Sequence, residues 1–275
     1  MTGLKGFTPR LYQETILNTC VKHNTLVVLP TGMGKTAIAL MLASHRLSSY
    51  PNSKILFLAP TKPLVAQHMT SFKKSMDVSM AVLTGEISPE KREQLWKDST
   101  IIFSTPQGMS NDIINNRIKL EEVSCLILDE IHRCTGEYDY KWICEQYDKR
   151  AKYARILGLT ASPGSDMAKV LEICKNAYID EIEVRTHDDP DVKPYMQETE
   201  LDYINVELTP DFKIVQKYIK DCLKERLKEM KQYGYLNNSS MVSKKELLDI
   251  QGSLHKRIAQ GEKSPELWKA VSISA

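Results

Sequence analysis

Six short runs of apolar and β-branched residues recur along the first 160 residues, and longer amphipathic stretches separate them. The runs are TLVVLP (25–30), KILFLAP (54–60), SMAVLT (79–84), TIIFST (100–105), VSCLILD (123–129) and RILGLT (155–160). Apolar residues that follow one another without strict alternation are typical of strands covered on both faces. Because each run is followed by a stretch with helical signals, the pattern predicts an α/β fold with a mostly parallel sheet flanked by helices.

The pattern changes after about residue 186. The polar, proline-bearing stretch RTHDDPDVKP (185–194) predicts a boundary, so we place a first domain at 1–186 and a connecting segment at 187–208. Within the connecting segment, LDYINVEL (201–208) predicts one further strand.

The remaining residues, 209–275, predict three helices. Thr209-Pro210-Asp211 begins a long one, and Gly234 can end it. We expect its apolar stripe to be buried; the stripe consists of Ile214, Val215, Tyr218, Ile219, Cys222, Leu223, Leu227 and Met230. A capping box at 243–246 and Ser264-Pro265 start the other two. The last helix is apolar up to Ala275, which suggests that the sequence is part of a longer chain.

Composition and charge exclude several classes of protein. No apolar run approaches the about 18 residues of a membrane span, so we expect no membrane partner. The six cysteines form no C-x-x-C pair, which argues against a zinc ribbon and fits a reduced, cytoplasmic setting. Net charge is only +2, but residues 211–275 hold 13 Lys and Arg against 8 Asp and Glu. This asymmetry favours a polyanion-binding appendage there.

The stretch LPTGMGKTAI (29–38) nearly matches the general phosphate-binding loop, which has a glycine where Leu29 stands. It lies between a predicted strand and a predicted helix, as a phosphate cradle requires. We expect residues 31–36 (Thr31, Gly32, Met33, Gly34, Lys35 and Thr36) to bind a nucleotide. Lys35 would reach the β- and γ-phosphates, and the Thr36 hydroxyl would hold Mg²⁺. The alternative is a glycine-rich turn that binds nothing.

A second acidic motif, LILDEIH (126–132), ends a predicted buried strand. Asp129 would hold Mg²⁺, directly or through water, and Glu130 would act as the general base for the attacking water. An Asp-Glu pair alone is often only a solvated strand end. Together with Lys35 it forms a predicted catalytic set.

These motifs, PTGMGKT, DEIH and GLTASPG (158–164), resemble motifs I, II and III of the DEAH-like superfamily 2 helicases. That family tolerates a non-glycine at the place of Leu29, and it usually has a small residue where Ile131 stands. The resemblance implies a RecA-like first domain that binds ATP with Mg²⁺. It also implies that His132, Thr160 and Ser162 couple hydrolysis to nucleic-acid movement. Their alternative role is to cap a turn or fill the core.

Other segments resemble further motifs of the same family. PRLYQ (9–13) resembles the Q-motif, which implies adenine recognition by Arg10 and Gln13 with Tyr12 beside them. APTKPLVAQH (59–68), LTGE (83–86) and STPQ (104–107) resemble the nucleic-acid-contacting motifs. The residues implied as contacts are Thr61, Lys62, Thr84, Gly85, Thr105 and Gln107, which could otherwise be ordinary loop residues.

A narrower resemblance is to the archaeal Hef and FANCM branch of fork-remodelling DNA translocases. DEIHRCTGEYDY, RILGLTASPGS and DPDVKPYM (189–196) carry it. It implies that 209–275 is the start of an inserted helical domain, and that the chain is the ATP-binding half of a DNA helicase or translocase acting on forked or branched DNA. An RNA-directed relative, similar to RIG-I or Dicer helicases, and a nucleotide-dependent binding module without turnover remain alternatives.

A second RecA-like domain, with the arginine that stabilises transition-state charge, has no counterpart among these 275 residues. The resemblance implies that such a domain elsewhere in the full-length chain is a partner of the site. An arginine finger contributes about 10³–10⁵ in rate in related phosphoryl-transfer systems. We therefore expect the 275 residues alone to be nearly inactive as an ATPase.

Overall fold

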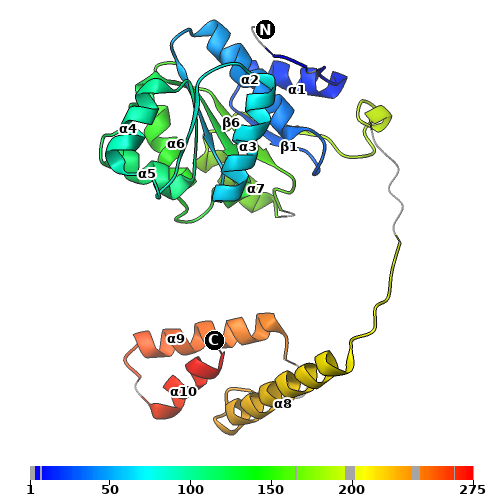
Figure 1. The fold of residues 1–275 in the computed structure, drawn as a ribbon. Coiled ribbons are helices and arrows are strands. Elements are labelled where there is room, and N and C mark those ends of the chain that lie inside the picture. Colours follow the sequence, from blue (N-terminus) through cyan, green and yellow to red (C-terminus); the bar gives the residue numbers. More distant parts are fainter. Residues whose placement is uncertain are drawn as a thin grey trace. The chain divides into compact units, whose positions relative to one another are not determined.

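The computed structural model describes residues 4–6, 8–164, 166–195, 202–236, 242–262 and 264–274. The chain divides into two compact units, Met1–Glu198 and Thr199–Ala275 (Figure 1).

The first unit is built on a parallel sheet of seven strands in the order β3-β4-β2-β5-β6-β1-β7. The strands are β1 (Thr25–Val28), β2 (Lys54–Leu58), β3 (Met80–Leu83), β4 (Ile101–Ser104), β5 (Val123–Asp129), β6 (Ile156–Thr160) and β7 (Glu181–Val184). Every pairing between them is parallel. The predicted α/β fold is confirmed, and the six apolar runs are six of the seven strands.

Helices cover both faces of this sheet. They are α1 (Leu11–Lys22), α2 (Lys35–Ser49), α3 (Lys62–Ser75), α4 (Pro89–Asp98), α5 (Pro106–Ile114), α6 (Asp139–Arg150) and α7 (Met167–Asn176). Three short 3-10 helices join them: η1 (Leu120–Glu122), η2 (Ile131–Arg133) and η3 (Lys193–Tyr195).

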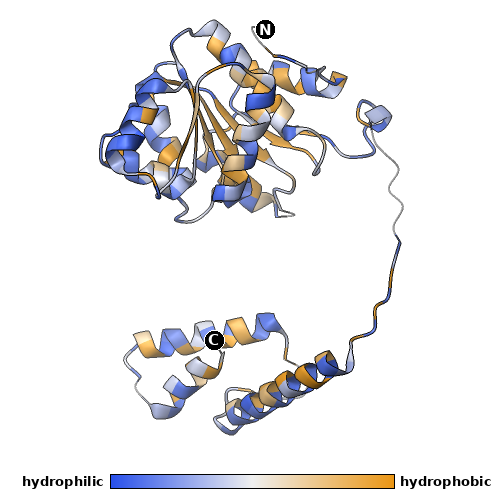
Figure 2. Cartoon of the chain, viewed as in Figure 1, coloured by the Kyte–Doolittle hydropathy of each residue, from blue (hydrophilic) through white to orange (hydrophobic). Residues whose placement is uncertain are grey.

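Two large apolar clusters form the core, one on each face of the sheet. In β5, Cys125 and Ile127 belong to the cluster under α1, α2 and α3. Leu126 and Leu128 belong to the other, with α5, α6 and α7. Successive side chains of a strand point to opposite faces, so a strand covered on both sides must be apolar throughout. Figure 2 shows these strands as the most hydrophobic part of the unit.

Parallel strands place the loops after their carboxyl ends along one edge of the sheet, where α/β proteins bind ligands. The strand order divides this edge into two halves. The loops after β1, β5 and β6 share one half and carry the predicted nucleotide and coupling residues. The loops after β2, β3 and β4 share the other and carry the predicted nucleic-acid contacts. Residues spread over 150 positions of sequence are thereby gathered along one edge.

The seventh strand, β7, was not predicted, and the strand predicted at 201–208 is wrong. β7 pairs only with β1, at the edge of the sheet, and its sequence EIEV alternates polar and apolar residues. Of the expected strand, residues 202–208 are described and form none; Tyr203, Ile204 and Val206 are each more than 80% exposed. These residues pair with no described strand, and without ladder hydrogen bonds their β-propensity alone does not form a strand.

The described residues of the second unit form three helices, α8 (Pro210–Gln232), α9 (Lys244–Ala259) and α10 (Pro265–Ser274). The predicted capping box is present: the Glu246 N–H donates to Ser243 Oγ at 3.2 Å. Gly234 follows α8 with φ of 75°, a conformation that favours glycine. The small core of this unit is built around Leu254, Leu267 and Ala270.

The apolar stripe of α8 is only partly covered. Leu227 and Met230 are buried, whereas the stripe residues nearer the start of the helix are exposed. The prediction that the whole stripe is buried is therefore wrong, although Figure 2 shows α8 with a hydrophobic side as expected. Among the described residues, no helix is long and apolar enough to cross a bilayer.

Candidate nucleotide and nucleic-acid site

The predicted phosphate loop connects β1 to α2 and contains two glycines in the left-handed region. Gly32 has φ of 83° and Gly34 has φ of 80°. Side chains rarely adopt this conformation, and a Cβ at Gly34 would lie 2.3 Å from Gln13 Nε2. The backbone conformation therefore favours glycine at position 34, and a larger residue there would also displace the Gln13 amide.

Lys35 is the first residue of α2 and is half-buried. Its Nζ donates to the carbonyl oxygens of Leu29 at 2.7 Å and Pro30 at 3.3 Å. Burial lowers the pKa of Lys35, while the nearby carboxylates of Glu130 and Asp129 oppose this. The amino group therefore lies inside the loop, close to the acidic motif, and a polyphosphate entering the loop would replace carbonyls as its partner.

The residues around Lys35 fit a magnesium–nucleotide. The N–H groups at the start of a helix have no preceding turn to bond to, so those of Lys35 and Thr36 are oriented for an anion. An ammonium, a hydroxyl at Thr36 and a carboxylate at Asp129 form a donor set suited to phosphate oxygens and a hard divalent cation. Thr31, Gly32 and Met33 line the same loop, with Met33 buried and the other two exposed.

Asp129 ends β5 and is held from two directions. His68 Nε2 lies 2.8 Å from its Oδ2, and both side chains are about nine-tenths buried. The Tyr140 hydroxyl donates to the Asp129 main-chain carbonyl at 2.7 Å. Sequence reasoning missed His68. Its signal was the spacing from Val65 and to Phe72, which places a histidine on the buried face of α3.

Glu130 and the three predicted coupling residues form one connected chain. Glu130 adopts φ of 52°, which is uncommon for a residue with a side chain and directs the chain into η2. His132 Nδ1 lies 3.1 Å from both Glu130 Oε2 and Thr160 Oγ1. Thr160 Oγ1 in turn accepts the Ser162 N–H at 3.2 Å. The carboxylate after β5 is thus connected through the His132 ring to the loop after β6.

Ile131, the residue that departs from the family pattern, is fully buried against β6. A Cβ at Gly158 would lie 2.2 Å from Ile131 Cδ1. The glycine of β6 therefore makes room for the larger side chain, and the acid pair keeps its place after β5.

The Q-motif residues contact the phosphate loop directly. The Tyr12 hydroxyl donates to the Met33 carbonyl at 2.6 Å. The Arg10 N–H donates to Gln13 Oε1 at 3.0 Å, and Arg10 Nη1 donates to the Tyr12 hydroxyl at 3.2 Å. Gln13 is 3% exposed, and its Nε2 has only long contacts of 3.5 Å with Tyr12 and Met33. In the structure, Arg10 and Gln13 lie beside the phosphate loop, where they were predicted to recognise adenine.

The other half of the edge holds the six predicted nucleic-acid contacts. Thr61 and Thr105 precede α3 and α5, and neither side chain caps its helix. Lys62 forms an exposed ion pair with Glu86, which joins the loops after β2 and β3. Gly85 and Gln107 are exposed and Thr84 is half-buried.

A buried ion pair fixes the helices behind these loops. Arg92 of α4 lies 3.0 Å from Asp112 of α5, and both side chains are at least nine-tenths buried. Arg117 also reaches Asp112, at 3.1 Å. Ser104 Oγ donates to the Leu83 carbonyl at 2.7 Å, which joins the ends of β4 and β3. None of these four positions was predicted.

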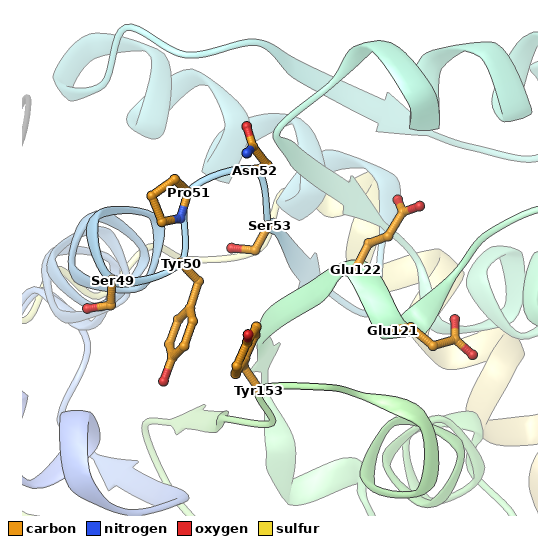
Figure 3. Close-up of a pocket in the computed structure, with 8 residues that line it drawn as sticks. All are labelled: Ser49, Tyr50, Pro51, Asn52, Ser53, Glu121, Glu122 and Tyr153. Atoms are coloured by element: carbon orange, nitrogen blue, oxygen red, sulfur yellow. The ribbon is translucent and has the colours of Figure 1, made fainter.

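A pocket of about 260 Å³ lies elsewhere, at the amino ends of the strands (Figure 3). Its wall includes Tyr50, which follows α2, and Glu122 and Tyr153, which precede β5 and β6. The two tyrosine rings stack with centroids 4.1 Å apart. The pocket is therefore at the edge of the sheet opposite the phosphate loop and is no part of the candidate site.

Comparison with known proteins assigns the family. The sequence model of the DEAD/DEAH box helicases matches residues 10–170, more than half of the chain. The chain belongs to the DEAD/DEAH box helicase family. The matched residues of its RecA-like domain include the strands β1 to β6.

The relatives are helicases of the Hef and Fanconi anemia group M kind. The Pyrococcus furiosus Hef helicase domain is 39% identical with a TM-score of 0.73, covering 99% of this chain and 59% of that one. The Drosophila melanogaster ATP-dependent DNA helicase Fancm is 34% identical over 94% of this chain. A Methanocaldococcus jannaschii protein named as an ATP-dependent RNA helicase is 43% identical over 91%. The chain spans 18% of the Drosophila protein and 32% of the Methanocaldococcus protein.

Proposed function

We propose that this chain is the ATP-binding lobe of an ATP-dependent DNA helicase or translocase that acts on forked or branched DNA. The observation that carries the proposal is the proximity of Lys35 to the carboxylates of Asp129 and Glu130, at the carboxyl ends of β1 and β5, the two strands on either side of β6. The names of several relatives, including the Drosophila DNA helicase Fancm and the ATP-dependent DNA helicase fml1 of Schizosaccharomyces pombe, support DNA as the substrate.

In this proposal each residue has a separate task. Lys35 binds the β- and γ-phosphates, and the Q-motif residues Arg10 and Gln13 bind the adenine. A magnesium ion held by Thr36 and Asp129 would neutralise charge on the phosphates. Glu130 takes the proton of the attacking water.

The connected contacts that start at Glu130 support the coupling role. His132, Thr160 and Ser162 take part in these contacts, so a change at the γ-phosphate can reach the loop after β6. The loops after β2, β3 and β4 carry the nucleic-acid contacts on the same edge, with Thr61, Lys62, Thr84, Gly85, Thr105 and Gln107 as the contacting residues. A second RecA-like domain would close over this edge.

An RNA-directed function is the second candidate, and the name of the Methanocaldococcus relative favours it. The deciding measurement is ATP hydrolysis by the full-length protein with forked DNA, duplex DNA or duplex RNA. We expect forked DNA to stimulate most. Stimulation by duplex RNA alone would overturn the DNA assignment and support the RNA candidate.

Two variants of the full-length protein test the residue roles. Glu130→Gln keeps the shape and removes the base, so it should retain ATP and lose about 10²–10⁴ in turnover. Lys35→Ala removes the cation that faces the phosphates, so it should weaken nucleotide binding itself. Equal ATP affinity and equal residual rates in the two variants would contradict these roles. Absence of hydrolysis in the unaltered protein under every condition would favour a binding module.

A further inference from the structure

The stretch DPDVKPY, residues 189–195, folds back from the edge of the sheet onto the start of α1 (Figure 1). Arg185, directly after β7, donates to Asp191 Oδ2 at 2.9 Å, which turns the chain. Val192 is fully buried in the core cluster that contains the apolar residues of α1. The short helix η3 that follows is therefore fixed against the first turn of α1.

Tyr195, the last residue of η3, contacts three consecutive residues there. Its ring lies edge-on to the Tyr12 ring, with centroids 5.8 Å apart and planes at 62°. The Arg10 guanidinium carbon lies 5.4 Å from the centre of the Tyr195 ring, within cation–π range. The Leu11 N–H reaches the Tyr195 hydroxyl at 3.5 Å. Tyr195 is 39% exposed, so these contacts occupy one side of the ring.

The contacted residues are connected by hydrogen bonds to the phosphate loop and to Gln13. Tyr12 donates to the Met33 carbonyl of the loop, and Arg10 donates its N–H to Gln13 Oε1. An amide carries the donor and acceptor that pair with the 6-amino group and N7 of adenine. A flat guanidinium offers a face on which a base can stack. Tyr195 therefore fixes the Arg10 guanidinium, on which a base can stack. It also fixes the first turn of α1, which orients the Gln13 amide.

Building on the proposed function, we propose that Tyr195 is a positioning residue for nucleobase recognition. It acts through Arg10 and Tyr12 and determines how strongly the site prefers adenine. A tyrosine that merely closed the edge of the core would affect every ligand of the loop alike. A positioning residue affects the binding of the base and leaves the binding of the phosphates unchanged. This difference can be measured.

The experiment compares the affinities of ADP, GDP and inorganic tripolyphosphate, each with Mg²⁺, by calorimetry. In Tyr195→Ala we expect ADP binding to weaken about two- to tenfold, the range of a lost cation–π contact, with the preference over GDP falling in step. Tripolyphosphate affinity should stay at the wild-type value, which also shows that the loop is folded. Tyr195→Phe keeps the ring and should bind ADP as the wild type does.

Two further variants complete the test. Tyr195→Leu keeps an apolar contact for Tyr12 but removes the aromatic face under Arg10, so it should behave as Tyr195→Ala does even if the alanine variant is unstable. Tyr153→Ala is the matched control, since Tyr153 is 40% exposed and lies at the opposite edge of the sheet. It should change none of the affinities.

The outcomes separate this inference from the proposed function. If the wild type binds ADP no more tightly than tripolyphosphate, the adenine site fails and this inference fails with it. If the wild type prefers ADP but Tyr195→Ala and Tyr195→Leu keep the wild-type ratio of affinities, only the role of Tyr195 is overturned. Equal weakening of ADP and tripolyphosphate would make Tyr195 a structural residue alone.

Discussion

At the scale of single residues, Asp129 is the most constrained group of the candidate site. One carboxylate oxygen lies 2.8 Å from His68 Nε2, and the main-chain carbonyl accepts the Tyr140 hydroxyl. Groups that fix a metal-binding carboxylate usually tune metal affinity, because the carboxylate need not be ordered when the metal arrives. In the proposed site His68 would hold Asp129 in place for Mg²⁺, and the centroid of the Phe57 ring lies 4.4 Å from that of the His68 ring.

We predict that His68→Ala raises the Mg²⁺ concentration needed for half-maximal ADP binding, by about 10–100-fold, the range found for outer-shell partners of metal sites. The Asp129 carboxylate loses its buried partner and must be ordered by the metal. His68→Gln places an amide N–H at a similar distance along the side chain and should recover most of the loss. A fluorescent ADP titrated with Mg²⁺ measures the effect.

His45→Ala, which removes an imidazole near the end of α2, serves as the control and should leave the Mg²⁺ dependence unchanged. The same half-maximal Mg²⁺ concentration in His68→Ala and the wild type would mean that the histidine only fills the core. Thermal unfolding of each variant separates loss of fold from loss of metal affinity.

Residues that the sheet topology brings together could be predicted from the sequence, whereas a residue placed by side-chain packing could not. His132, Thr160 and Ser162 lie within short motifs at strand ends, so the parallel sheet alone brings them together. His68 contacts Asp129 only because α3 packs against β3 and β4 and against the Phe57 ring of β2. That packing depends on the volumes of Phe57 and its neighbours, which no local pattern specifies.

At the scale of elements, η2 and β6 fit each other through one side chain. Ile131 is fully buried, and a Cβ at Gly158 would lie 2.2 Å from its Cδ1 and 3.2 Å from its Cγ1 and Cγ2. The packing of Ile131 against Gly158 thus sets the distance between the acidic motif and β6. The sequence showed Ile131 as a departure, but the glycine that accommodates it is in another strand.

We predict that Gly158→Ala destabilises the first unit by about 1–3 kcal/mol, the usual cost of overpacking a filled core. Ile131→Val removes Cδ1, the atom nearest the new methyl group, and alone should cost about 0.5–1.5 kcal/mol. Gly158→Ala should lower the free energy of unfolding less in the Ile131→Val background than in the wild type. Denaturant unfolding of all four proteins gives the coupling energy, and strict additivity would show that the two side chains do not compete for space.

Burial explains which strands the sequence predicted. Six strands are covered on both faces, and coverage imposes a continuous apolar run that can be recognised without a structure. β7 lies at the edge, with Ile182 and Val184 about half exposed, so its polar alternation gives a weaker signal. Residues 202–208 have the composition of a strand and no partner. Composition reports propensity, whereas a strand also requires hydrogen bonds to a partner strand.

At the scale of the whole molecule, the two units differ in how much apolar surface each buries. The first has two large clusters, one on each face of its sheet. The second is held by a few side chains, chiefly Leu254, Leu267 and Ala270, while Tyr218 and Ile219 of α8 are 70% and 63% exposed. A region with few buried apolar contacts opens at a lower free energy than one with many.

We predict that the second unit of the 275-residue chain unfolds before the first, so that thermal unfolding is not two-state. MgADP should stabilise only the first unit, by about 2.7 kcal/mol at 100 times its dissociation constant, because a ligand stabilises the unit whose folded state binds it. Hydrogen exchange followed by mass spectrometry resolves the units, with peptides from β5 and α9 as reporters. MgADP should slow exchange in β5 and leave α9 unchanged, and Lys35→Ala should abolish the effect on β5. A single transition shared by both peptides, or equal protection of α9 by MgADP, would show instead that the two units fold as one.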